Sequence, residues 1–463
     1  MTATISEALP GTDAGGNDGH AFLGHPRGLA YLAFTEMWER FSFYGMKALL
    51  VLYMVQGLLL PGHIDNIVGI STYRTALEAL FGPLSVTGLA SLTFGFYTGL
   101  VYFTPVLGGL LADRFLGARR TVVIGAALMS IGHFAMAFEQ SFLVALLLLV
   151  IGSGCLKGNI SSQIGHLYPP ADVSRRTRAF TIFSTGINIG ATIGPLVCGL
   201  AAQIYGWDAG FGIAGILMVV ATAIYLAGQR HLPDVRPRKQ AAEPAPALVK
   251  DDWRRIWLLL TVMAISMFQT IAYDQCFNIG MIWINEHVDL TTPIGQVPVA
   301  WFTSIDSFAS IIAAALLIMF WRWQATRGTE PGDIAKIGIG AAITAASAAL
   351  LALGAWLSGD GKTSAFIPFL AFSGMGFAFI YYWPPLLALV CRAAPSQINS
   401  TMMGLAFSSI FIADIFMGWI GTFYERMSPA AFWSLNVAIA ATGALIVATF
   451  GRSLDRALRI AFD

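Results

Sequence analysis

Four charged residues lie within one long apolar stretch near the beginning of the chain: Glu36, Glu39, Arg40 and Lys47. Each would cost about 2.5–3.5 kcal/mol at the centre of a lipid-facing helix, so these side chains must pair with one another or face water. At helical spacing Glu36, Glu39 and Arg40 share one face, which Tyr44 and Lys47 extend. A carboxylate beside a guanidinium stays ionised, whereas an unpaired one in apolar surroundings binds a proton. The face is therefore either a buried ion pair that locks helices together or, as we favour, a charged wall of a central cavity.

The composition is that of a protein embedded in a lipid bilayer. Of the 463 residues, 56% are hydrophobic and 11% are charged, whereas soluble domains carry about 25% charged residues. The net charge of +1 gives no indication of a nucleic-acid partner. The four cysteines are spaced too irregularly for a metal site and are expected to be packing residues: Cys155, Cys198, Cys276 and Cys391. We expect no metal and no cofactor.

Apolar segments of about 20 residues, the length that crosses a bilayer, follow one another along the chain. We predict twelve of them, and hence an all-α polytopic membrane protein. Their spans are 28–58, 84–111, 120–138, 142–161, 178–205, 209–228, 255–285, 299–321, 335–357, 364–391, 400–423 and 430–451. A proline-rich linker at 231–252 separates a six-helix bundle (27–230) from a second one (253–463), which is the plan of the major facilitator fold. Residues 1–26 lack the apolar core of a signal peptide and are expected to be a disordered cytoplasmic tail.

The basic residues indicate which way the segments run. If the N-terminus is cytoplasmic, most of the 27 Lys and Arg residues fall in cytoplasmic loops, and the outer loops carry only Arg74, Lys362 and Arg426. This asymmetry follows the positive-inside rule and predicts that both termini are cytoplasmic.

The loop after the second segment carries a motif of its own. Residues 108–120 read GGLLADRFLGARR, which resembles the major facilitator loop signature G-x-L-x-D-R-x-G-[RK]-[RK]. Its glycines allow two helices to approach closely, and Asp113 at a helix end can meet a neighbouring helix N-terminus or an arginine. We expect Asp113 to control a cytoplasmic gate rather than to contact substrate.

Polar residues within later segments are further candidates for the cavity. Lys157 is the only basic residue of the fourth segment, where it either ends in a polar cavity or snorkels to the interface. Asn188 in the fifth segment needs hydrogen-bonding partners. Asp274, Asp306 and Asp414 are intramembrane acids, and Asp414 is the weakest candidate because the sequence places no polar cluster near it.

Two segments of the second bundle are unusual. The tenth contains Trp383-Pro384-Pro385, which must break its hydrogen-bond ladder. The seventh carries a polar cluster that includes Asn278. Broken helices at mid-membrane often line binding sites.

A set of motifs spread over the whole membrane portion is similar to one known family. The set comprises GHPRGL at 24–29, Glu36-x-x-Glu39-Arg40-Phe41-Ser42-Phe43-Tyr44-Gly45, Tyr102 with Thr104-Pro105, Lys157, INIG at 187–190 and WFxSI at 301–305. The second of these motifs resembles E-x-x-E-R-F-x-Y-Y-G, the signature of the proton-dependent oligopeptide transporters. The chain is therefore identified as resembling that family.

The resemblance implies a symporter that carries di- and tripeptides into the cell with protons. In the family, the glutamates of the first motif take part in proton coupling, and the arginine and the lysine bind the peptide carboxylate. Residue by residue, these roles would pass to Glu36, Glu39, Arg40 and Lys157. The backbone of the peptide would receive hydrogen bonds from Tyr44, Tyr102 and Asn188, with Asn278 also near the substrate.

The resemblance further implies an outer gate in which a basic residue after the first motif pairs with an acid beyond the seventh helix. Lys47 and Asp289 match those positions, although Glu286 is close by and Lys47 is as readily a snorkelling residue. The linker is too short for the two extra helices that many bacterial members insert, so twelve helices are expected rather than fourteen.

Three departures from the family pattern affect the site. Phe43 replaces a tyrosine, and Ser184 stands where a tyrosine is common. The tenth segment carries no acid between residues 376 and 383, where the family has a glutamate that pairs with the lysine and with the peptide amine. We hypothesise that Asp306 of the eighth segment supplies this amine-binding carboxylate.

These observations favour proton-coupled peptide symport, and they leave alternatives. The missing acid in the tenth segment favours a relative that moves another anionic or zwitterionic solute, such as nitrate or an amino-acid conjugate. A membrane enzyme or receptor is disfavoured, because no Ser/His/Asp cluster, metal-ligand spacing or phosphate loop is present. We expect a monomer in a bacterial inner membrane.

Overall fold

The computed structural model describes residues 22–169, 172–233, 248–293, 295–359 and 361–460. The tail at 1–21 and the linker residues 234–247 lie outside the described residues. Within the described part, the chain forms fourteen α-helices: α1 (Arg27–Tyr53), α2 (Ile70–Phe81), α3 (Val86–Leu111), α4 (Ala118–Ala135), α5 (Phe142–His166), α6 (Val173–Tyr205), α7 (Trp207–Gly228), α8 (Lys250–Asp274), α9 (Ile279–His287), α10 (Trp301–Thr326), α11 (Asp333–Ser358), α12 (Phe366–Ala393), α13 (Asn399–Gly421) and α14 (Pro429–Ile460).

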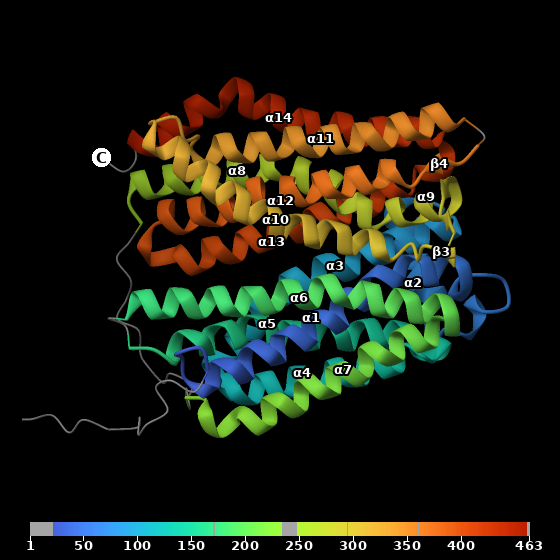
Figure 1. The fold of residues 1–463 in the computed structure, drawn as a ribbon, viewed down its shortest axis with the longest axis horizontal. Coiled ribbons are helices and arrows are strands. Elements are labelled where there is room, and N and C mark those ends of the chain that lie inside the picture. The colour runs from blue at the N-terminus through green and yellow to red at the C-terminus, as the bar shows by residue number, and fades with distance from the viewer. Residues whose placement is uncertain (1–21, 170–171, 234–247, 294, 360, 461–463) are drawn as a thin grey trace, which may run out of the picture.

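The helices form two bundles that lie against each other (Figure 1). Helices α1 to α7 make the first bundle, in which α1 packs against α6 and α7, and helices α8 to α14 make the second, in which α11 packs against α12 and α14. The end of α7 and the beginning of α8 lie at one end of the molecule, which we call the linker end. The opposite end, called the loop end, carries four short strands: β1 (Val288–Asp289), β2 (Thr291–Thr292), β3 (Gly295–Gln296) and β4 (Thr363–Ser364).

Eleven of the helical stretches within the described residues are long and apolar enough to cross a membrane. Each of the twelve predicted segments coincides with helix, but α4 is not among the eleven. It has only 18 residues and begins with Ala118-Arg119-Arg120, which lowers its apolar character. The structure therefore confirms an all-helical membrane protein.

Two details of the helices differ from the prediction. The predicted segment 255–285 is interrupted, because α8 ends at Asp274 and a 3₁₀ turn, Gln275–Phe277, leads into α9. The tenth segment is not divided at Pro384 and Pro385, since α12 continues through both prolines. Each proline removes one backbone donor, but its neighbours in the bundle hold the helix together.

Helix α2 is not among the predicted segments, because its 12 residues are too few to cross a bilayer. It is amphipathic and buries Ile70 and Leu77.

Close packing between α1 and α6 fixes the position of the charged face. A Cβ atom at Gly190 would collide with the carbonyl oxygen of Met37 and would lie 3.0 Å from Cβ of Arg40. Gly194 similarly lies against the carbonyl oxygen of Phe41. Glycines at these positions let the two backbones approach closely, as in other membrane helix pairs.

The two bundles contact each other at the loop end. The Ser91 hydroxyl donates to the carbonyl oxygen of Gly418 at 2.9 Å, and the Trp301 indole N–H donates to the carbonyl oxygen of Leu196 at 2.9 Å. Contacts between α3 and α13 continue toward the linker end, where a Cβ at Gly404 would lie 3.5 Å from Val106. We call this line of contacts the α3–α13 seam.

Helix α6 separates two kinds of exposed residue. Thr181, Ser184 and Asn188 are exposed and share one face at helical spacing, whereas the exposed residues Ile189 and Ile193 lie on another face. Apolar residues suit a lipid-facing surface, and the polar stripe suits a cavity. We infer from the polar stripe that water enters between the bundles from the linker end, and we call this space the cavity.

Candidate functional site

The charged face of α1 is buried and forms an ion cluster. Nε of Arg40 lies 2.6 Å from Oε2 of Glu39 and 2.9 Å from Oε1 of Glu36. All three residues are at most 6% exposed. Nη2 of Arg40 and Oε2 of Glu36 nevertheless have no hydrogen-bonding partner among the described groups. A buried polar atom without a partner is costly, so this cluster retains capacity to bind a ligand.

Lys157 of α5 is held by aromatic rings rather than by an acid. Its Nζ lies 4.3 Å from the ring centroid of Phe43 and 5.1 Å from that of Tyr102. It is close enough to interact electrostatically with Glu36 and Glu39, but no carboxylate lies within ion-pair distance of it in the described chain. An ammonium over two ring faces gains cation–π attraction while its N–H donors stay available.

The remaining candidates of the first bundle surround this pair of cations. Tyr44 is half-buried on α1, with its ring 5.1 Å from that of Phe43. Tyr102 is also half-buried, and Asn188 is exposed on the polar stripe of α6. The Asn188 amide therefore needs no partner within the protein, because water can form its hydrogen bonds.

On the second bundle, Asp306 of α10 faces the same region. The Tyr273 hydroxyl of α8 lies 3.1 Å from Oδ1 and 3.0 Å from Oδ2 of Asp306, to which it donates. Asp306 is 6% exposed. The Tyr44 phenol of the first bundle is close enough to interact electrostatically with both Arg40 and Asp306.

The structure does not pair Lys47 with Asp289. Nζ of Lys47 lies 3.9 Å from Oδ1 of Asp274, while Asp289 is exposed in β1. A hydrogen bond from the Thr291 backbone N–H lowers the pKa of the Asp289 carboxyl. The reason is the break after α8: Asp274 stays at the bundle contact, and α9 carries the chain away to Asp289.

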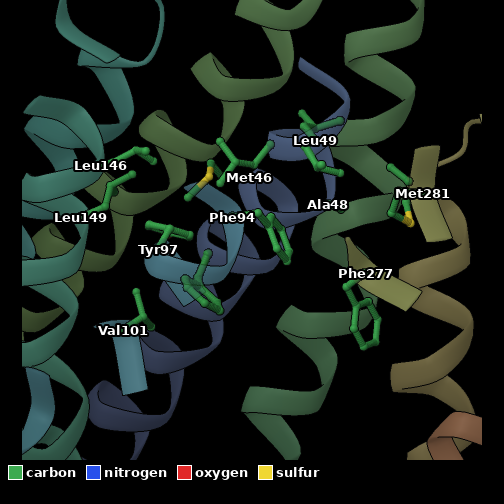
Figure 2. Close-up of a cluster of buried hydrophobic side chains, with 14 of the residues drawn as sticks. Met46, Ala48, Leu49, Phe94, Tyr97, Val101, Leu146, Leu149, Phe277 and Met281 are labelled. Atoms are coloured by element: carbon green, nitrogen blue, oxygen red, sulfur yellow. The ribbon is translucent and has the colours of Figure 1, made fainter. Parts of the chain in front are cut away.

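Lys47 does not snorkel either. It is only 9% exposed, and its Nζ lies 5.8 Å and 5.0 Å from the ring centroids of Phe94 and Phe277. Figure 2 shows these two rings within the buried cluster that also holds Met46 and Met281. Glu286, the other acid considered for the gate, instead accepts a hydrogen bond from the Tyr424 hydroxyl at 3.1 Å.

Asn278 lies in the contact between the bundles and not in the cavity. It is fully buried, and its Nδ2 lies 2.6 Å from the Ser91 hydroxyl, to which it donates. The same amide nitrogen also contacts Oε1 of Gln275 at 3.2 Å. The 3₁₀ turn after α8 directs this side chain toward α3, so the expectation that Asn278 binds substrate is not met in this structure.

Asp113 lies at the linker end, in the π-helical turn Ala112–Leu116. It is exposed, and no ion pair with it forms within the described residues. Its position at the linker end fits the predicted gate. The ion pair with an arginine that the gate would use does not form in this structure.

Asp414, the weakest candidate by sequence, lies at a close contact between the two bundles. It is 1% exposed on α13, and its Cβ and backbone lie against Gly99 and Gly95 of α3. The signal was present in the sequence, because two glycines four residues apart within a membrane segment indicate a close helix contact. A single sequence does not say which helix makes that contact.

Known proteins resemble this chain in sequence and in structure. The model of the family described as POT family matches residues 119–249 and 245–435. The chain is 28% identical to a di-/tripeptide transporter of Lactococcus lactis subsp. cremoris, over 90% of this chain and 93% of that protein. It is 26% identical to the peptide transporter YePEPT of Yersinia enterocolitica, over 93% of this chain and 94% of that protein. A crystal structure of peptide transporter POT in complex with sulfate matches with a TM-score of 0.82 and 25% identity, covering 94% of this chain and 96% of that chain.

Proposed function

Because the chain belongs to the POT family, we propose that it is a symporter that carries di- and tripeptides into the cell together with protons, by alternating access. The names of its relatives, a di-/tripeptide transporter and a peptide transporter, support the choice of substrate. It is proposed to act as a monomer that requires no cofactor beyond the proton gradient.

One observation carries this proposal: cations and an acid face each other across the two bundles. Arg40 and Lys157 stand on the first bundle, and Asp306 stands on the second. A free peptide has a carboxylate at one end and an ammonium at the other. Arg40 and Lys157 would bind the carboxylate, and Asp306 would bind the ammonium through charge-assisted hydrogen bonds. Tyr44 and Tyr102 would contact the backbone between them.

Proton coupling would follow from competition for Arg40. Glu36 and Glu39 share this guanidinium. When the carboxylate of a peptide takes part of its hydrogen-bonding capacity, a glutamate loses its counter-charge and binds a proton. Binding of peptide and of proton would then favour each other, and the linkage is reciprocal.

A second candidate function rests on the helix that carries no acid. Between Gly376 and Trp383, α12 has no carboxylate, and Lys157 has no carboxylate within ion-pair distance in the described chain. An ammonium without a carboxylate partner suits an anionic solute such as nitrate, or an amino-acid conjugate. Asp306 favours a peptide over such an anion, because its carboxylate would bind the ammonium of the peptide.

We further propose the membrane arrangement. Helix α4 would also cross the membrane, which brings the number of spans to twelve. The linker end would face the cytoplasm of a bacterial cell, with both termini on that side. The positive-inside rule supports this orientation, because outer loops carry only Arg74, Lys362 and Arg426. Lys47 and Asp274, rather than Asp289, would form the gate at the loop end, and Asp113 would act at the linker end.

Uptake into proteoliposomes tests the function. Labelled dialanine should accumulate when the outside is more acidic than the inside, and accumulation should stop when an ionophore removes the gradient. The same vesicles are then offered nitrate and single amino acids. Accumulation of nitrate in place of dialanine would establish the second candidate and overturn the first.

A further inference from the structure

Helices α11 and α14 lie side by side on the flank of the second bundle that faces away from the first bundle (Figure 1). A groove with a volume of about 570 Å³ runs between them, and we call it the α11–α14 groove. Val447 is buried at its floor, where a Cβ at Gly338 would lie 2.5 Å and a Cβ at Gly451 3.1 Å from the Val447 side chain. The glycines thus let the two helices approach closely beneath the groove.

Short side chains leave this groove unfilled. Ala335 and Ala342 of α11 and Ala448 of α14 are exposed and line it. The larger side chains of Ile339 and Leu445, which are also exposed, stand beside them. The lining between these residues is apolar and lies on the flank that lipid covers. A hydrocarbon chain that occupies the groove gains van der Waals contacts along its length.

The length of the groove matches one leaflet of a bilayer. Along α11 its lining extends from Gly332, at the linker end, to Ala342, which is a helical rise of about 15 Å. The hydrocarbon core of a bilayer is about 30 Å thick, so each leaflet contributes about half of that. The groove therefore suits an acyl chain of the leaflet at the linker end.

At the linker end the groove adjoins a second cavity of about 570 Å³, and Asp455 lines both. The other charged side chains of this second cavity form two ion pairs. Nζ of Lys336 lies 2.6 Å from Oε1 of Glu330. Nη2 of Arg392 lies 2.8 Å from Oδ2 of Asp333. These pairs make the mouth of the groove polar, so that the groove and the second cavity together form an amphipathic site.

Arg452 and Asp455 of α14 are the remaining charged residues of the two linings. Arg452 is exposed and forms no ion pair within the described part of the chain. Its guanidinium presents a fork of N–H donors that matches a phosphate. The Asp455 carboxylate accepts hydrogen bonds, as an ammonium requires. Because basic and acidic residues balance in the linings, they complement a headgroup that carries both charges better than one that is only anionic.

We propose that the α11–α14 groove is a binding site for one molecule of phosphatidylethanolamine from the leaflet at the linker end. An acyl chain lies along the groove, the phosphate binds Arg452, and the primary ammonium binds Asp455. The site lies on the flank away from the first bundle and is therefore separate from the proposed peptide site. A lipid that binds only the folded protein stabilises it by mass action.

Native mass spectrometry of the delipidated protein in detergent tests the choice of lipid. Titration with phosphatidylethanolamine should give one tightly bound lipid per chain. Phosphatidylcholine with the same acyl chains has a trimethylated ammonium without N–H donors, so it should bind about tenfold more weakly. Equal affinity for these two lipids, or tighter binding of phosphatidylglycerol, would overturn the proposal.

Four variants test the place of binding. Ala448→Leu fills the groove and should weaken the binding of phosphatidylethanolamine severalfold, whereas Ala438→Leu, the same change at an exposed position of α14 outside the groove, should not. Arg452→Gln should weaken the binding of both lipids, and Asp455→Asn should reduce the preference for phosphatidylethanolamine over phosphatidylcholine.

Thermal unfolding provides the second measurement. Without lipid, the four variants should unfold at the midpoint of the unaltered protein, which shows that they are folded. Phosphatidylethanolamine should raise the midpoint of the unaltered protein and of Ala438→Leu, and should raise that of Ala448→Leu less. Lipid binding that is unchanged in both Ala448→Leu and Arg452→Gln would place the lipid elsewhere and contradict the proposal.

Discussion

Arg40 pairs with two carboxylates on one helical turn, and the proposed proton coupling depends on this shared pairing. Glu39 is fully buried with its Oε2 2.6 Å from the guanidinium. If a substrate carboxylate bound the unpaired Nη2 of Arg40, it would share the guanidinium with Glu36 and Glu39 and would weaken the attraction of Arg40 for them. Under the proposed coupling, Glu36 or Glu39 would then bind a proton when substrate occupies the site.

Replacement of Glu39 by glutamine should separate transport from its driving force. Glu39→Gln removes a carboxylate that can bind and release a proton, so gradient-driven accumulation of dialanine should fall to the level seen without a gradient, while part of the peptide exchange remains. Glu78→Gln is the matched control, because Glu78 pairs with Arg74 on α2, away from the cavity. Full gradient-driven accumulation in Glu39→Gln would contradict the coupling role.

Replacement of Asp306 should reveal which end of the peptide it binds. Loss of a charge-assisted hydrogen bond, about 1.5–3 kcal/mol, should raise the KM for dialanine at least about tenfold in Asp306→Asn. An N-acetylated dipeptide has no ammonium, so its KM should be the same in the variant and in the unaltered protein. Tyr273→Phe keeps the acid and should have the smaller effect. Undiminished uptake with unchanged affinity in Asp306→Asn would show that Asp306 does not bind the peptide ammonium.

The sequence identified the chemistry at these positions but not every partner. The cluster of Glu36, Glu39 and Arg40 follows from helical spacing alone. The family resemblance pairs Lys47 with Asp289, because nothing in a single sequence reveals that the chain turns after Asp274 and leaves that acid at the bundle contact. Contacts between distant segments depend on tertiary structure, and spacing along one helix does not determine them.

At the scale of helices, the approach of α6 to α1 positions the site. Gly190 lies against the carbonyl oxygen of Met37, one turn before Arg40. Periodicity and length located almost every helix, because hydrophobic runs of about 20 residues are unambiguous. They could not locate α2, which is short and amphipathic, or the interruption between α8 and α9, because polar residues within an apolar run do not show where a helix ends.

A methyl group at Gly190 should therefore disturb the whole site. Gly190→Ala overpacks the α1–α6 contact, which typically costs about 1–3 kcal/mol, and should lower the midpoint of thermal unfolding by about 1–3 °C and reduce dialanine uptake. Gly165→Ala is the control, since a Cβ there meets nothing within 4 Å. Equal midpoints for the two variants would show that the contact is looser than the structure indicates.

For the whole molecule, the closed loop end and the polar stripe of α6 imply access from one side. In a background without the native cysteines, Ser184→Cys should react with a membrane-impermeant thiol reagent in inside-out vesicles and should be protected by dialanine. Ser91→Cys should not react, because Ser91 is fully buried where the bundles meet. Labelling of Ser184→Cys from the outside of right-side-out vesicles alone would contradict the orientation.

The α3–α13 seam has a consequence for how the molecule can move. Its contacts run from Ser91 and Gly418 near the loop end to Val106 and Gly404 toward the linker end, with the Phe103 and Phe411 rings 5.4 Å apart between them. These contacts hold the bundles together along most of the length of α3. The bundles therefore cannot separate along the seam without breaking them. We therefore expect the bundles to rotate about the seam when they part, so that the passage for a solute would widen on the opposite flank, where α6 and α10 are in contact.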